Sequence, residues 1–116
     1  MAIERLDSAF ADAQVAGENL TGKEMYLAHR NGDKELVICG STEVVAGVIQ
    51  KGTVAGKSTT ISRGPICKVV GGAAIAAGAI LVSDSTGRAV TGTTGRFGIA
   101  RNAISAANEI VEVAMD

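Results

Sequence analysis

The sequence has few large apolar side chains, because aromatic residues make up only 3% of it and tryptophan is absent. Hydrophobic residues nevertheless amount to 47%, which allows a packed core and excludes wholesale disorder. That apolar content consists mainly of Val, Ile and 19 Ala, alongside 15 Gly. Burial stabilises by roughly 25 cal/mol per Å², so small side chains stabilise a monomer only weakly. We therefore expect one domain that gains further burial in an oligomer.

Proline is also scarce, and the charged residues form no cluster of one sign. A single proline and glycines without a period of three exclude collagen. Lys and Arg number 11 and Asp and Glu number 12, giving a formal net charge of −1. A protein that wraps nucleic acid needs clustered Lys and Arg, and so does electrostatic attachment to a membrane. We therefore expect neither nucleic acid nor a membrane as a partner.

Long apolar runs are missing as well. The longest uncharged run, residues 69–83, has 15 residues and three glycines, whereas about 18 residues are needed to span a bilayer. Residues 1–7 carry neither the basic nor the apolar region of a secretory signal. These features predict a soluble protein made in the cytoplasm.

Metal-binding residue types are few, since the chain has one histidine, His29, and two cysteines, Cys39 and Cys67. Each cysteine lies in apolar sequence, which is typical of a reduced, buried thiol, and a reducing compartment disfavours a disulfide. One histidine and two cysteines are too few for a four-ligand metal site. His29 shares a face of its predicted strand with Met25 and Leu27, so a structural role is expected. We expect no metal and no cofactor.

Catalytic patterns are absent in the same way. Residues 52–58 (GTVAGKS) have three residues between their glycines where a phosphate-binding P-loop has four. A strand-like run follows Lys57, whereas a P-loop leads into a helix. No serine lies in the Gly-x-Ser-x-Gly context of a nucleophile elbow, and the carboxylates occur singly. We therefore expect no enzyme, and a nucleotide-dependent enzyme using Lys57 is the alternative to be tested by ATP binding.

The segment 1–22 differs from the rest of the chain. Ile3, Leu6 and Phe10 follow helical spacing, and Gly17 would end the turn. Both a short helix and an N-terminal arm fit this pattern. The apolar side chains either pack on the chain's own β domain or insert into a groove of a partner.

The segment 23–116 has the period of two that is typical of strands. Asn31-Gly32 is a strong hairpin signal between two of them. The last strand is the clearest, since Val111, Val113 and Met115 alternate with the residues of the other face. We predict a mainly β fold, a small barrel or sandwich of short strands with Gly-rich turns. The expected strands cover residues 25–30, 36–39, 44–50, 58–62, 66–70, 79–83, 88–91, 97–101 and 109–115.

The pattern over residues 44–116 resembles the capsid cement or decoration proteins of tailed bacteriophages. The resemblance rests on strand and turn patterns in order along the chain: Val45–Ile49 with the Gly-rich turn after it, Gly64–Val69, Ala74–Val90, Phe97–Ala103 and Glu109–Val113.

This resemblance implies a small structural protein, usually a homotrimer, on the outer surface of the virion capsid. It implies that the major capsid protein is the partner, that neighbouring subunits are bridged, and that no enzyme, cofactor or metal is involved. Within that function, Ile3, Leu6 and Phe10 are the candidate capsid-docking residues. The alternative function is a small β module displayed on the virion that binds a host-surface ligand, although few aromatic residues are available for a sugar platform.

Overall fold

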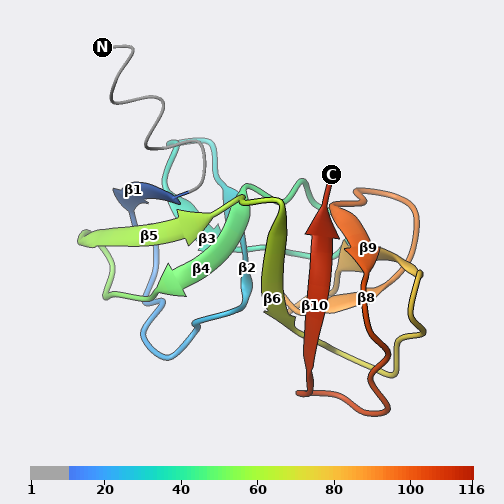
Figure 1. Ribbon diagram of the computed structural model, residues 1–116. Helices are drawn as coiled ribbons and strands as arrows, with labels where there is room; N and C mark the ends of the chain where they lie inside the picture. Colours follow the sequence, from blue (N-terminus) through green and yellow to red (C-terminus); the bar gives the residue numbers. More distant parts are fainter. Residues whose placement is uncertain (1–10) are drawn as a thin grey trace.

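The computed structural model describes residues 11–116, with side chains from Val15 onward. Within these residues the chain forms ten strands and no helix, joined by turns and loops (Figure 1). This confirms the mainly β fold. The strands are β1 (Ala11–Val15), β2 (Leu27–Arg30), β3 (Leu36–Ile38), β4 (Gly47–Lys51), β5 (Ser58–Ser62), β6 (Ile66–Val70), β7 (Ile80–Ser83), β8 (Ala89–Thr91), β9 (Gly98–Ala100) and β10 (Ile110–Met115). In this described part, no helix is long and apolar enough to cross a membrane.

The strands form two five-stranded antiparallel sheets, each built from one half of the chain. The first sheet has the order β1-β5-β4-β2-β3, and the second has the order β6-β10-β9-β7-β8. A bridge between Gly71, which follows β6, and Ala89 in β8 joins the two edges of the second sheet. The second sheet therefore curls into a half-barrel. Figure 1 shows the two sheets side by side, with β6 next to the first sheet.

The two faces of β4 contribute to two separate hydrophobic clusters, because adjacent strand residues point to opposite faces. Val48 packs in the larger cluster, which includes Leu81 and Val113 of the second sheet. Ile49 packs in the smaller cluster with Leu20. The larger cluster thus joins the two sheets, and the smaller one covers the far face of the first sheet.

Residues 11–22 are extended at their start rather than helical. Strand β1 pairs with β5 along its whole length, and Ala16 and Leu20 behind it are fully buried. An isolated helix this short is marginal in water, whereas an extended segment can hydrogen-bond to the open edge of β5. The sequence pattern placed the start of the β domain at Lys23. In the structure the first sheet begins earlier, with β1 at Ala11.

The predicted hairpin at Asn31-Gly32 is present, but its loop is longer than a two-residue turn. Residues 31–35 connect β2 and β3, and Arg30 pairs with Leu36. The Asn31 side-chain oxygen accepts hydrogen bonds from the backbone N–H of Asp33 (2.9 Å) and of Glu35 (3.0 Å). The asparagine side chain thus organises the loop, which explains why this residue marked the turn.

The turn between β7 and β8 is organised by one carboxylate in a similar way. Asp84 Oδ1 accepts hydrogen bonds from the N–H of Thr86 (2.8 Å) and of Arg88 (2.9 Å). Asp84 Oδ2 lies 3.2 Å from the Arg88 Nε, and the Asp84 side chain is only 19% exposed. Burial alone would raise the pKa of Asp84, but the hydrogen bonds from Arg88 and Thr86 and the Arg88 charge outweigh it and lower the pKa.

An Asp84→Ala variant is expected to lose about 2 kcal/mol of unfolding free energy at pH 7, because charge-assisted hydrogen bonds from a largely buried carboxylate to the backbone of the turn are lost. A lowered folded-state pKa means that this contribution is present above about pH 3.9, the ordinary value of an unfolded aspartate. It is lost as the pH falls through the folded-state pKa. Urea unfolding at several pH values measures this difference, which should shrink in acid. Asp33→Ala, at an exposed aspartate, is the control, and equal losses in both variants would refute the assignment.

Candidate interaction surface

The outer face of the second sheet carries an apolar row that crosses four strands. Ile66 of β6 lies opposite Ala114 of β10, and Ala114 lies opposite Ile99 of β9. Ile99 in turn lies opposite Ile80 of β7. Directly opposed residues on one face of a sheet have neighbouring side chains. These four residues therefore form one continuous strip, called the apolar row below.

A charged row runs beside the apolar row on the same face. Lys68 of β6 lies opposite Glu112 of β10, and the Glu112 carboxylate accepts a contact from Arg101 Nη1 at 3.0 Å. Both side chains of that ion pair are nearly half exposed, at 47% for Arg101 and 41% for Glu112. On the other side of the charged row, Ile110 of β10 lies opposite Val70 of β6. The face thus presents charges of both signs between apolar side chains.

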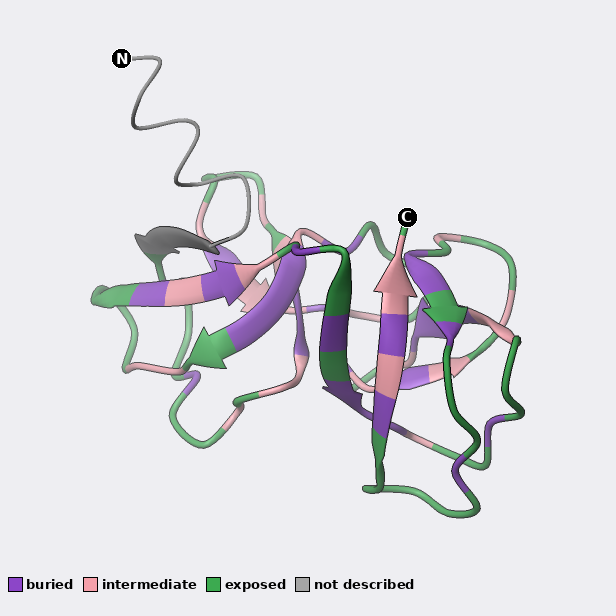
Figure 2. Ribbon diagram, viewed as in Figure 1, coloured by how far each residue is buried: buried purple, intermediate pink, exposed green. Residues whose placement is uncertain are grey.

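Three large hydrophobic side chains are exposed on this face of the second sheet. Ile66 is 49% exposed, Ile110 39% and Ile99 38%. The other exposed large hydrophobic residues of the described part are single valines that lie in the first sheet or its loops. Figure 2 shows exposed bands on β6, and one exposed and several intermediate bands on β10, alternating with buried ones. Clustered exposed apolar groups of this kind mark an interaction surface.

The sequence pattern identified only the inner face of β10. Val111 and Val113 are buried, as the alternation predicted, and Met115 packs against the larger cluster. The outward-facing residues Ile110 and Ala114 did not predict an apolar patch, because two apolar residues on one face of a single strand are too few to form one. The patch arises from strand register, which brings β6 and β9 beside β10.

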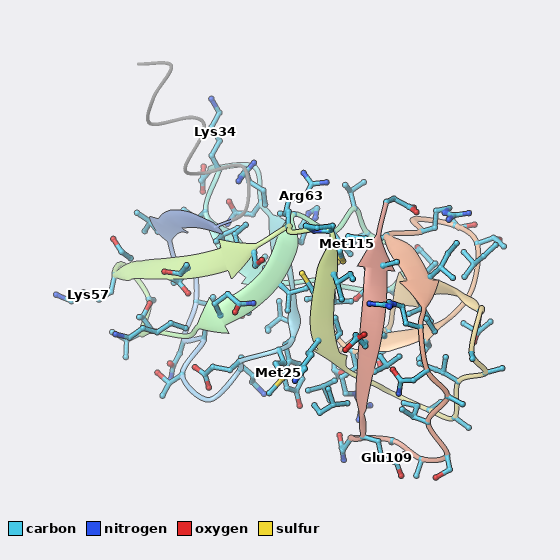
Figure 3. The ribbon with its side chains drawn as sticks, viewed as in Figure 1. Met25, Lys34, Lys57, Arg63, Glu109 and Met115 are labelled. Carbon is cyan, nitrogen blue, oxygen red and sulfur yellow. The ribbon has the colours of Figure 1, made fainter. Side chains whose placement is uncertain are left out.

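The apolar row continues into a hollow between the two sheets. This hollow has a volume of ≈360 Å³, and Ile66 lies at its wall together with Met25, Ile49 and Cys67. Figure 3 shows the labelled Met25 at the junction of the two sheets. The wall of the hollow also carries polar side chains, among them Glu24, Gln50 and Lys68, so the junction of the two sheets is of mixed character.

Of the residues 52–58 that approximate a P-loop, residues 52–57 form an ordinary loop between β4 and β5. Strand β5 begins at Ser58 and no helix follows within the described chain. Lys57 is exposed and points away from both sheets (Figure 3). Phosphate binding by successive amides at a helix N-terminus has no basis in this geometry.

The remaining predicted residues are placed as follows. Cys39 and Cys67 are buried and free, as predicted. The candidate docking residues Ile3, Leu6 and Phe10 lie outside the described residues.

The second sheet thus presents an apolar row and a charged row on one open face. The family model of the phage cement protein matches residues 11–115. The chain therefore belongs to the phage cement protein family, whose members are structural and associate with the phage capsid. This membership confirms the predicted resemblance and the prediction that the chain is not an enzyme.

A solved structure with the same fold is that of the head fiber gp8.5 N base in bacteriophage phi29. It is 19% identical to this chain with a TM-score of 0.71, and the alignment covers 91% of this chain and 92% of that one. At that identity the likeness establishes the fold. No curated protein matches the chain.

Proposed function

We propose that the chain binds the outer surface of a phage capsid as a homotrimer and stabilises the shell by bridging neighbouring major capsid subunits. Membership of the phage cement protein family is the observation that supports this function most directly. The head fiber protein of similar fold belongs to a phage head, which is consistent with an outer position.

The outer face of the second sheet is the proposed contact between copies of the chain. In a closed trimer, one patch of each copy contacts a different patch of the next copy. The charged row can contribute to both patches, because Lys68 and Arg101 of one copy can oppose Glu112 of another. The apolar row beside it supplies the burial that the small-residue core leaves short. Ile66 and Ile99 would become buried in that contact.

Association would also account for tight attachment to a shell. Each copy needs only a modest contact with a capsid subunit, because linked copies raise the effective concentration of the next contact. Such multivalency increases apparent affinity by about 100-fold to 10,000-fold without any new contact. An oligomer that touches several subunits at once also opposes their separation.

The proposed capsid contact is the segment before β1, which carries Ile3, Leu6 and Phe10. Deleting residues 1–10 should reduce shell binding at least about tenfold, while the unfolding free energy changes by no more than about 0.5 kcal/mol. The cut stops there because β1 pairs with β5 and Leu20 is fully buried. Co-sedimentation with shells and urea unfolding measure the two quantities, and normal shell binding by the truncated chain would refute the docking role.

Light scattering combined with co-sedimentation tests the proposed function. In solution the chain should have three times the mass of one chain, and it should pellet with purified shells that lack it. A stable monomer that stays in the supernatant would contradict both parts of the proposal.

A further inference from the structure

Three side chains with metal-binding atoms meet where β2 approaches the loop between β3 and β4. His29 comes from β2, Cys39 is the first residue of that loop, and Glu43 lies in the middle of the loop. The ligand atoms, an imidazole nitrogen, a thiol sulfur and a carboxylate oxygen, all lie within 4.8 Å of one another. His29 Nε2 lies 3.6 Å from Glu43 Oε2. Three ligands of one tetrahedral ion have separations of this size, given metal–ligand bonds of about 2.0–2.3 Å.

The histidine ring is oriented for this role by a backbone carbonyl. His29 Nδ1 lies 2.9 Å from the carbonyl oxygen of Val44. Because a carbonyl only accepts hydrogen bonds, Nδ1 must carry the proton. Nε2 then faces the carboxylate of Glu43, and either a proton or a metal ion can lie between these two atoms. A carbonyl that fixes Nδ1–H while Nε2 faces other ligands is the usual arrangement of a metal-binding histidine.

The other two ligands are also held in place. Gly40 N–H donates to Glu43 Oε1 at 2.7 Å, which leaves Oε2 for a second partner. Two hydrogen bonds attach the loop to the second sheet. Ser83 Oγ donates to the backbone carbonyl of Cys39 at 3.3 Å, and the backbone N–H of Thr42 donates to the backbone carbonyl of Ser83 at 3.2 Å. Ligands fixed before binding lose little conformational freedom when an ion binds.

We propose that His29, Cys39 and Glu43 bind a divalent transition-metal ion of the zinc class, with water as the fourth ligand. Sulfur, imidazole and carboxylate together form a donor set suited to zinc, and three protein ligands with one water complete a tetrahedron. The sequence analysis predicted no metal because it counted only histidine and cysteine as ligands for a four-coordinate ion. The carboxylate of Glu43 supplies the third protein ligand, and loop geometry rather than sequence spacing brings it there.

Binding requires the thiol to lose its proton, which is released to the solvent as the sulfur–metal bond forms. Burial raises the pKa of Cys39, an effect that the Ser83 hydroxyl partly offsets and the Glu43 charge adds to. A divalent cation at the sulfur favours the thiolate and so opposes this effect of burial. The Glu43 side chain is 46% exposed and the His29 side chain 26%, so an ion can enter from solvent.

Cobalt(II) is the probe for this site, because thiolate ligation gives it a charge-transfer band that imidazole and carboxylate do not produce. We expect the reduced full-length chain to develop this band on titration to one equivalent, and zinc to remove it by competition. Zinc should also raise the melting temperature, as any ligand of the folded state does. No thiolate band at one equivalent would overturn the proposal.

The two cysteines provide matched variants. Cys39→Ser should abolish the band, whereas Cys67→Ser should retain it, because Cys67 belongs to no group of three metal-binding side chains among the described residues. Glu43→Gln and His29→Gln, at partly exposed positions, should each weaken cobalt binding at least about tenfold while the chains remain folded. A band that survives Cys39→Ser, or unchanged affinity in both Gln variants, would show that the three side chains form only an ion pair over a buried thiol.

Discussion

An Ile99→Glu variant is expected to be monomeric and to bind shells at least about 100-fold more weakly than the wild type, because it loses the avidity of an oligomer. Ile99 lies in the middle of the apolar row, between Ala114 and Ile80. A glutamate there would bury an unpaired charge in the contact between copies, which is strongly unfavourable. In the isolated chain the same side chain is 38% exposed, so the fold itself should tolerate the change.

The measurement is the molar mass by light scattering, followed by co-sedimentation with shells. Val54→Glu is the matched control, because Val54 is a hydrophobic residue of even greater exposure, 51%, in the loop between β4 and β5. The control should keep the oligomer and the affinity. An Ile99→Glu chain with the wild-type mass would exclude the second sheet as the contact.

A Gly52→Ala variant is expected to lose roughly 3 kcal/mol of unfolding free energy, at the upper end of the usual cost of overpacking. A Cβ atom on Gly52 would overlap the backbone carbonyl of Leu20. That segment cannot retreat easily, since Leu20 is fully buried and its N–H donates to the Thr53 carbonyl at 2.7 Å. Gly52 N–H also donates to the carboxylate of Glu24 at 2.8 Å.

Gly32→Ala is the control for this substitution, because nothing lies within 4 Å of the position of its Cβ. It should change the unfolding free energy by no more than about 0.5 kcal/mol. Urea unfolding of both variants measures the difference. Equal unfolding free energies of the two variants would contradict the claim that the close approach of Gly52 to Leu20 requires a glycine at position 52.

Much of the fold could be predicted from the sequence, because short strands and their turns are local features. The predicted strands over residues 58–62 and 66–70 match β5 and β6 in both bounds. The alternation over residues 109–115 correctly identified Val111 and Val113 as core residues. Turn chemistry at Asn31 and Asp84 also marked real turns, since each side chain hydrogen-bonds the backbone a few residues on.

The features that depend on long-range register could not be predicted in this way. The apolar row needs Ile66, Ile99 and Ala114 to be opposed, although they come from three separate strands. Strand β1 pairs with β5, far along the chain, and the sequence pattern did not mark residues 11–15 as a strand. The meeting of His29 with Glu43 likewise depends on the loop between β3 and β4 rather than on any spacing in the sequence.

The central claim, that this chain strengthens a phage shell, is tested most directly by the temperature at which shells release their DNA. Shells purified without the protein should release it at a lower temperature than the same shells saturated with the chain. The Ile99→Glu variant at the same concentration should give little protection, and Val54→Glu should protect as the wild type does. An unchanged release temperature at full occupancy would contradict the account.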